Sequence, residues 1–137
     1  MNNKKSSLKN IFGLCLLLCA VVMLSSAKGD DGVITKENGM TVVNTTTLSK
    51  NVIGYVGTTP LKIYIQKDKI VRVEMLKNQE TPKYNAMIKR KLIPAWNDMK
   101  LKDAEKQKVD GVTGATITSD AVKKNVQLGL EYYKKHK

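Results

Sequence analysis

Thiols and imidazoles are almost absent from this sequence. Its two cysteines, Cys15 and Cys19, both lie in one apolar run near the N-terminus, so no cysteine occurs from Lys28 onward. Disulfides, thiolate catalysis, iron–sulfur clusters and c-type haem are therefore excluded for that part of the chain. The single histidine, His136, stands next to the C-terminus, which argues against a Ser-His-Asp triad and against a histidine zinc site. Any redox chemistry must come from a bound organic cofactor.

Aromatic and acidic residues are also scarce. The chain has one Trp, one Phe and five Tyr, and they are scattered, so it offers no stacking platform for single-stranded nucleic acid. The formal net charge is +12, and outside the first 27 residues 21 basic residues stand against 12 acidic ones. Such an excess attracts acidic partners or an anionic membrane surface. We expect a solvated basic surface near a membrane and no nucleic-acid partner.

The first 27 residues have the pattern of a secretory signal. Lys4, Lys5 and Lys9 precede an apolar run from Ile11 to Leu24, and Ser25-Ser26-Ala27 then places small residues at the −3 and −1 positions of a cleavage site. Both cysteines follow a leucine, where lipidation would need a small residue, which argues against lipidation. The run of 14 residues is short of the roughly 20 that span a bilayer, so we favour a cleaved signal over a retained anchor. The sequence therefore predicts export to the periplasm or to the outer face of the cytoplasmic membrane.

The remainder of the chain is long enough for one small domain with a single core. Residues 28–40 are polar and punctuated by glycine, and we expect a linker there, followed by one domain over residues 41–137. Residues 97–108 are polar and charged, which predicts a connector within that domain. The expected organisation is thus a signal peptide (1–27), a linker (28–40) and a single domain (41–137).

Hydrophobic patterning predicts strands followed by helices. β-branched and alternating residues predict four strands, two of them joined as a hairpin, over residues 41–47, 52–56, 61–66 and 70–75. Helical spacing predicts a helix over residues 84–93 that ends at Pro94, and another over residues 120–135 capped by Thr118 or Ser119. This order is typical of the α+β class, in this case a small antiparallel sheet with helices packed against it.

One short segment carries the clearest chemical signal. Thr116 follows a Gly114-Ala115 pair and stands just before the predicted second helix. The small residues let the backbone approach a bulky phosphate, and the helix start directs free N–H groups and partial positive charge toward it. The segment therefore suits a phosphate group that is bound at Thr116 or esterified to its hydroxyl. A plain helix cap after a glycine turn is the alternative interpretation.

The full pattern from Asp110 to Thr116 resembles the flavin-attachment motif of the FMN-binding domain family, Asp-x-x-(Ser/Thr)-Gly-Ala-Thr. In that family the last threonine carries FMN through a phosphoester bond. A separate flavin transferase takes the FMN from FAD with magnesium, and the acidic residue is recognised by that enzyme or helps to activate the hydroxyl. An unactivated threonine alcohol is a poor nucleophile, so a base or metal is required. The resemblance implies FMN as cofactor and these cofactor-binding residues: Asp110, Thr113, Gly114, Ala115, Thr116 and Thr118.

The resemblance extends over residues 51–135. Gly54-Tyr55 and Thr59-Pro60-Leu61 resemble the opening strand and turn of the family. Glu80-Thr81-Pro82 resembles the start of a Glu-Thr-Pro-Gly-Leu-Gly loop in its larger members, which are peripheral subunits of the sodium-pumping NADH:quinone reductase and of the Rnf complex. This chain departs after the proline, with Lys83-Tyr84-Asn85 in place of Gly-Leu-Gly. Flavin contacts from residues 80–84 are therefore not carried over.

Aromatic and basic side chains outside the motif are candidates for contact with a flavin. Tyr55, Tyr84 and Trp96 are candidates for the isoalloxazine ring, although a core or surface role suits each of them equally well. Four basic residues can favour an anionic reduced flavin or a docking partner, but we favour a solvated face for them. These four are Lys62, Lys89, Arg90 and Lys91.

Three functions remain open at this point. The first is an exported flavoprotein that carries FMN covalently on a threonine and relays electrons at the outer face of the cytoplasmic membrane, with membrane redox proteins as donor or acceptor. The second is a non-covalent FMN-binding accessory or sensor module. The third is a basic secreted interaction domain without a cofactor. No substrate-activating acid, base or metal is visible in the sequence, so an electron carrier is favoured over a stand-alone enzyme.

Overall fold

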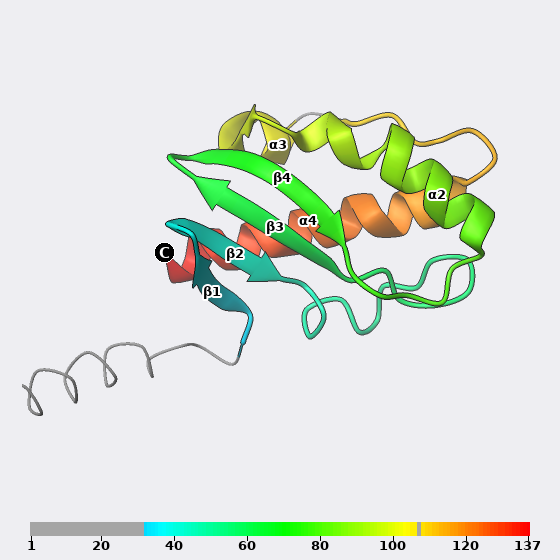
Figure 1. Ribbon diagram of the computed structural model, residues 1–137, viewed down its shortest axis with the longest axis horizontal. Helices are drawn as coiled ribbons and strands as arrows, with labels where there is room; N and C mark the ends of the chain where they lie inside the picture. The colour runs from blue at the N-terminus through cyan, green and yellow to red at the C-terminus, as the bar shows by residue number, and fades with distance from the viewer. Residues whose placement is uncertain (1–31, 107) are drawn as a thin grey trace, which may run out of the picture. The chain divides into compact units, whose positions relative to one another are not determined.

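Five short strands form one antiparallel sheet. The computed structural model describes residues 32–106 and 108–137. The strands lie side by side in the order in which they occur in the chain, and each pairs antiparallel with its neighbours. They are β1 (Ile34–Glu37), β2 (Met40–Asn44), β3 (Leu61–Gln66), β4 (Lys69–Met75) and β5 (Met99–Lys100), shown in Figure 1.

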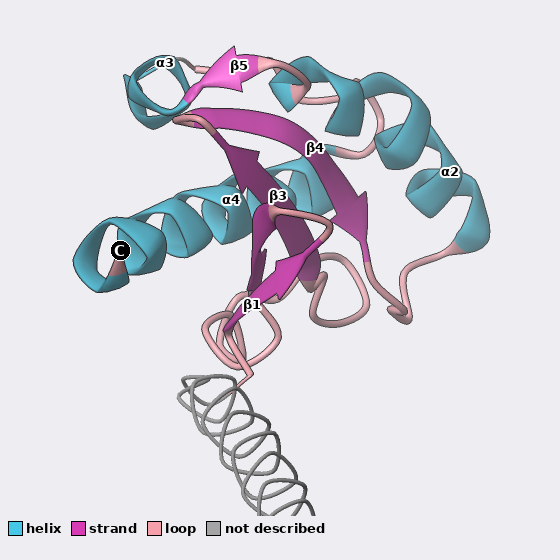
Figure 2. Ribbon diagram, turned by 60° about the vertical axis from the view of Figure 1, so that its left-hand side comes forward, coloured by secondary structure: helices cyan, strands magenta, loops and turns pink. Residues whose placement is uncertain are grey.

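Helices pack against this sheet. In the described ranges these are α2 (Pro82–Lys91), the 3-10 helix η1 (Ile93–Trp96), α3 (Leu101–Lys106) and the long α4 (Thr116–His136). The last helix, α4, crosses one face of the sheet (Figure 2) and packs against β2 and β3. The 3-10 helix η1 packs on β4. The predicted α+β class, with helices on a small antiparallel sheet, is confirmed. No helix within the described residues has the length and apolarity needed to cross a membrane.

The core lies between the sheet and α4, and one glycine sets their spacing. Ile63 of β3 and Val122 and Val126 of α4 are almost fully buried there. A Cβ atom added at Gly129 would lie 2.6 Å from Ile63 Cδ1 and 3.1 Å from Thr45 Cγ2. Both distances are too short for ordinary contact, so the absence of a side chain at Gly129 allows α4 to approach the sheet this closely.

Gly129→Val is therefore expected to lower the free energy of unfolding by about 2–3 kcal/mol, because overpacking a filled core forces side chains and backbone apart. Gln127→Val is the matched control, since Gln127 is exposed on the same helix. Its expected cost is only the helix propensity of a β-branched residue, about 0.5 kcal/mol. Urea unfolding of both variants measures the difference, and equal losses would contradict the close packing at Gly129.

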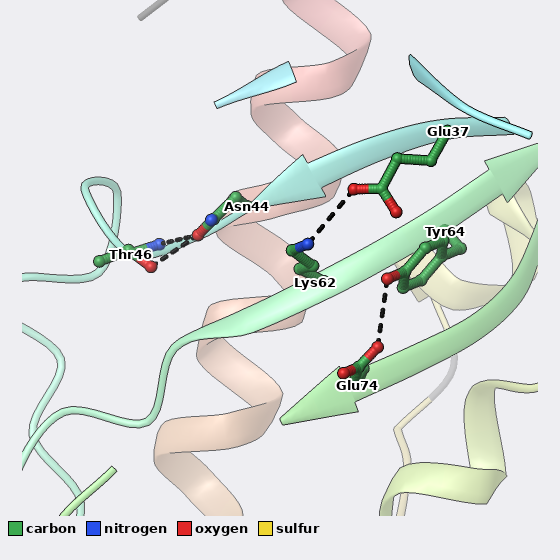
Figure 3. A network of polar contacts seen from close by, with 6 residues as sticks. All are labelled: Glu37, Asn44, Thr46, Lys62, Tyr64 and Glu74. Carbon is green, nitrogen blue, oxygen red and sulfur yellow. Dashed lines mark hydrogen bonds and ion pairs between the residues drawn. The ribbon is translucent and has the colours of Figure 1, made fainter. Parts of the chain in front are cut away.

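The face of the sheet away from α4 carries several paired polar side chains. Lys62 Nζ donates to Glu37 Oε1 at 3.3 Å, and Tyr64 Oη donates to Glu74 Oε2 at 3.1 Å (Figure 3). The Arg72 guanidinium lies 3.9 Å from the centre of the Tyr64 ring. Hydrogen bonding to Glu37 also holds the pKa of Lys62 above its ordinary value. The pairing of Lys62 on a solvated sheet face agrees with the favoured interpretation of that residue.

The structure differs from the sequence prediction at the start of the domain. The segment expected to be a linker contributes β1 and the first residue of β2. A two-residue turn, Asn38-Gly39, joins these strands, and both of its residues have positive φ. Asn-Gly is the preferred sequence for such a hairpin turn, so a local signal for β1 is present in the sequence.

Three further segments differ. Residues 52–56 make only an isolated bridge from Ile53 to Thr58, because the N–H groups of Tyr55 and Val56 donate to the buried carboxylate of Glu80 and that of Gly54 donates to the Gly57 carbonyl. The expected connector over residues 97–108 contains β5 and α3. Finally, α4 begins at Thr116, four residues earlier than predicted, and neither Thr118 nor Ser119 is its N-cap.

Candidate functional site

A tight turn leads the chain into α4. The N–H of Ala115 donates to the carbonyl oxygen of Val112 at 3.0 Å, which closes a four-residue turn. Its third residue, Gly114, has φ of +84°, as a type II turn requires at that position. No atom lies within 4 Å of a Cβ built on Gly114, so the backbone is open to a bulky group on that side.

Ser119 holds this turn against the helix. Its buried Oγ accepts a hydrogen bond from the N–H of Val112 at 3.0 Å and donates to the carbonyl oxygen of Ala115 at 2.7 Å. Ser119 therefore fixes the turn from inside the helix, and the N-cap position falls to Ala115, whose side chain offers no capping bond. The cap predicted at Thr118 or Ser119 is wrong for this reason.

Thr116 is the first residue of α4, and its side chain is exposed. Among the described residues, nothing forms a hydrogen bond with its hydroxyl. The first backbone N–H of this helix with a partner is that of Ser119, which donates to the Ala115 carbonyl at 2.9 Å. The N–H groups of Thr116, Ile117 and Thr118 thus have no partner in the part of the chain that the structure describes. Free amides at a helix start, together with the helix dipole, favour an anion such as phosphate.

An open cavity of about 290 Å³ lies beside Thr116. Its walls are residues 114–118 on one side and the rings of Tyr55 and Tyr84 on the other. The two rings meet edge to face, with their centres 6.1 Å apart and their planes at 75°. Tyr55 and Ile117 are 63% and 55% exposed, so apolar surface is available on both sides. This combination suits a ligand with a flat aromatic ring and a phosphate.

Glu80 connects the two sides of the cavity. Its carboxylate is buried, and Oε1 accepts the N–H groups of Val56 at 2.8 Å and Gly57 at 3.0 Å. Oε2 accepts the N–H of Tyr55 at 3.2 Å and the hydroxyl of Thr118 at 2.5 Å. Successive backbone amides thus form an anion-binding nest that the protein fills with its own carboxylate. Glu80 ties the loop that carries Tyr55 to the first turn of α4.

The electrostatics of Glu80 follow from these bonds. Burial raises the pKa of its carboxyl, but the Thr118 hydroxyl and the N–H groups of Val56, Gly57 and Tyr55 outweigh burial and hold that pKa below its ordinary value. Hydrogen bonds to the charged form therefore keep Glu80 ionised in the folded protein.

This depressed pKa predicts a specific acid sensitivity. A carboxyl with a lower pKa in the folded state stabilises the protein above its unfolded pKa of about 4.3, and this stabilisation is lost as the pH falls through the folded value. We expect the free energy of unfolding to fall more steeply below pH ~4.3 in the wild type than in Glu80→Gln, which has no carboxyl to protonate. Urea unfolding across this pH range tests the expectation, and parallel curves would contradict it.

A second contact fixes the loop before β3. Asn125 of α4 is fully buried, and its Nδ2 donates to the Thr59 carbonyl at 2.6 Å and to the Thr59 hydroxyl at 3.0 Å. The loop from Tyr55 to Thr59 is therefore held by α4 at two points, one through Glu80 and one through Asn125.

The structure brings together four of the six predicted site residues. Gly114, Ala115, Thr116 and Thr118 line the cavity, and Thr118 does so with a buried hydroxyl that contacts Glu80. The other two, Asp110 and Thr113, are exposed and lie outside its lining.

The other candidate residues separate into two groups. Tyr55 and Tyr84 line the cavity, whereas Trp96 is 2% exposed and belongs to the core. A further set is exposed in the last turn of α2, away from the cavity lining, namely Lys89, Arg90 and Lys91. The described residues contain no group of three or more His, Cys, Asp or Glu side chains that could hold a metal ion.

Sequence reasoning missed the role of Glu80. The segment that it begins resembles the start of a known loop, but nothing in the local sequence indicates that this glutamate is buried. The one residue in the sequence that relates to this role is Gly54, which leaves room for the carboxylate: an added Cβ there would lie 2.8 Å from Glu80 Oε1. Gly54 stands 26 residues before Glu80, so the reason for a glycine at that position is clear only once the fold brings the two segments into contact.

Comparison with known proteins points to the same part of the chain. A family model described as FMN-binding domain matches residues 54–131. This range includes the loop that carries Tyr55, Glu80 and every residue that lines the cavity. No curated protein and no solved structure matches the chain.

Proposed function

Because the chain belongs to the FMN-binding domain family, with FMN as its cofactor, we propose that it carries FMN covalently on Thr116 and relays electrons at the outer face of the cytoplasmic membrane. The observation that carries this proposal is the start of α4. There an exposed hydroxyl and three N–H groups, all without a partner among the described residues, meet an open glycine turn beside a cavity walled by tyrosines.

The attachment is a transfer of FMN without a change of oxidation state. The Thr116 oxygen attacks the FMN phosphorus of FAD, the phosphoanhydride bond breaks and AMP leaves. The hydroxyl proton passes to a base. No described residue forms a hydrogen bond with the Thr116 hydroxyl, so the base and the magnesium belong to the flavin transferase. Asp110, exposed ahead of the turn, is free to contact that enzyme.

Residues around the cavity would hold the attached group. The N–H groups of Thr116, Ile117 and Thr118 would receive the phosphate, and the Tyr55 and Tyr84 rings would flank the isoalloxazine. FMN supplies one- and two-electron transfer, while the protein contributes position and electrostatics. Glu80 maintains the geometry by fixing Tyr55 relative to α4.

The N-terminal region supports export. The basic, apolar and small-residue pattern of residues 1–27 lies outside the described residues and is the pattern of a secretory signal. Export would place the domain where membrane redox proteins can act as electron donor or acceptor.

Peptide mapping tests the attachment site. The chain is co-expressed with a flavin transferase in the exported compartment, denatured and digested. We expect one fluorescent peptide that contains Thr116 and is heavier by FMN less one water. If flavin is released on denaturation and the chain is unmodified, the covalent proposal is wrong and the protein is a non-covalent FMN-binding module. A colourless, unmodified chain would leave a basic domain without a cofactor and overturn the proposal.

A further inference from the structure

A second and larger cavity lies at the other end of α4. Its volume is about 510 Å³, compared with about 290 Å³ for the cavity beside Thr116. The β3–β4 turn, the start of α3 and the last turns of α4 form its walls. Figure 1 shows where β3, β4, α3 and α4 lie in the domain. A helix of 21 residues is about 30 Å long, so the two cavities mark opposite ends of the domain.

The walls of this cavity are rich in uncompensated positive charge. One ion pair is present, between Lys134 Nζ and Glu105 Oε2 at 3.4 Å, and Asp68 is the other acidic residue on the walls. Five more lysines converge on the cavity without an ion pair to any described residue. They are Lys67, Lys69, Lys100, Lys102 and Lys137.

The cavity floor is apolar. Leu130 is 2% exposed, and Leu101 and Tyr133 are half-buried beside it. Apolar residues next to several lysines without an ion pair suit an anion that also has an apolar body. Lysine side chains at such a site extend their charged ends toward an anionic surface while their stems cover apolar ones.

We propose that this cavity binds the phosphate groups of anionic phospholipids at a membrane surface. Two further features of the chain favour a lipid source: the secretory pattern of residues 1–27, which predicts export across a membrane, and the excess of basic residues after it. Each lysine near an anionic bilayer adds to the attraction, and five act together here. The proposal does not depend on flavin attachment. Its consequence is that the Thr116 end of α4 points away from the bilayer.

Lysine footprinting on vesicles tests this site. The protein, as exported by the cell, is acetylated while bound to vesicles of phosphatidylcholine, with or without phosphatidylglycerol. Protection is measured at each lysine separately, so that binding through an apolar run in any chain that keeps its signal does not count as binding through the cavity. With phosphatidylglycerol we expect the five cavity lysines to be protected at least about fivefold, and Lys89 and Lys91 on α2 to be unchanged. Equal protection of both sets, or none, overturns the proposal.

Two additional experiments distinguish lipid phosphate from a soluble phosphate, and binding by the cavity from attraction by the total charge. If inorganic pyrophosphate protects the cavity lysines as strongly as the vesicles do, the site takes a soluble anion and the lipid assignment is wrong. Charge reversal in K100E/K102E should remove most of the protection of Lys67 and Lys69. The control K89E/K91E has the same net charge and should leave that protection intact. Equal losses in both variants would show that total charge, and not the cavity, governs binding.

Discussion

Thr116→Val is expected to abolish covalently bound FMN, with at least a hundredfold loss of flavin that survives denaturation. Valine keeps the β-branched shape of threonine and removes only the hydroxyl that would form the ester. Because Thr116 is exposed and its hydroxyl has no partner among the described residues, the melting temperature should not change. In-gel flavin fluorescence and intact mass, with and without the transferase, measure the effect.

Thr47→Val is the matched control, because it makes the same change at an exposed threonine outside the motif. Thr47 also lies outside the cavity lining, so flavin attachment should continue. Thr116→Ser, which keeps a hydroxyl, should retain attachment at a lower level. Full fluorescence in Thr116→Val would place the ester elsewhere. Flavin that is retained but released on denaturation would show that the site binds FMN without a covalent bond.

Glu80→Gln is expected to lower the free energy of unfolding by about 2–4 kcal/mol, because buried donors lose a charged acceptor. The amide supplies one acceptor oxygen and turns an NH₂ group toward N–H and O–H groups that themselves donate. The loop that carries Tyr55 should loosen from α4 as a result. We therefore expect hydrogen-exchange protection to be lost first at residues 55–57, together with a lower yield of attached flavin. Urea unfolding, amide exchange and in-gel flavin fluorescence measure these effects.

Glu74→Gln is the matched control for the loss of a carboxylate. Glu74 is exposed and accepts one hydrogen bond, from Tyr64, so its replacement should cost less than about 1 kcal/mol. Gly54→Ala perturbs Glu80 by a different route, since the added Cβ would lie 2.8 Å from Oε1. It should reproduce the loosening expected in Glu80→Gln. Stability equal to wild type in both Glu80→Gln and Gly54→Ala would refute the structural role of Glu80.

The sequence predicts those strands and helices whose hydrophobic residues follow a regular local spacing. Alternation marks β3 and β4, and helical spacing ahead of Pro94 marks α2, so the α+β class follows from them. The predicted start of α4 is too late because its hydroxyl residues resemble caps, whereas a turn closed by Val112 and Ala115 forms the actual entry. The Asn38-Gly39 hairpin is visible in the sequence, but the polar residues around it favour a linker.

The sequence predicts only the Thr116 side of the cavity. The motif alone places Thr116 at a helix start, because small residues allow a phosphate to approach and the hydroxyl can form an ester with it. The opposite side depends on contacts between distant segments. Glu80 reaches the N–H groups of residues 55–57 and the Thr118 hydroxyl, which lies 38 residues further along the chain. No periodicity records such contacts, so this part of the site emerges only from the fold.

The order of the strands also limits how this protein can associate with itself. In the described part of the chain, β1 and β5 are the outer strands of the sheet, and outer strands are templates for edge-to-edge aggregation. β5 has two residues and runs directly into α3, while β1 has four residues, including the exposed Lys36. β5 pairs with only the first two residues of β4, and η1 packs on β4, so the edges offer an approaching strand little to pair with. A concentrated sample of the folded protein should therefore resist fibril growth through the edges of its native sheet.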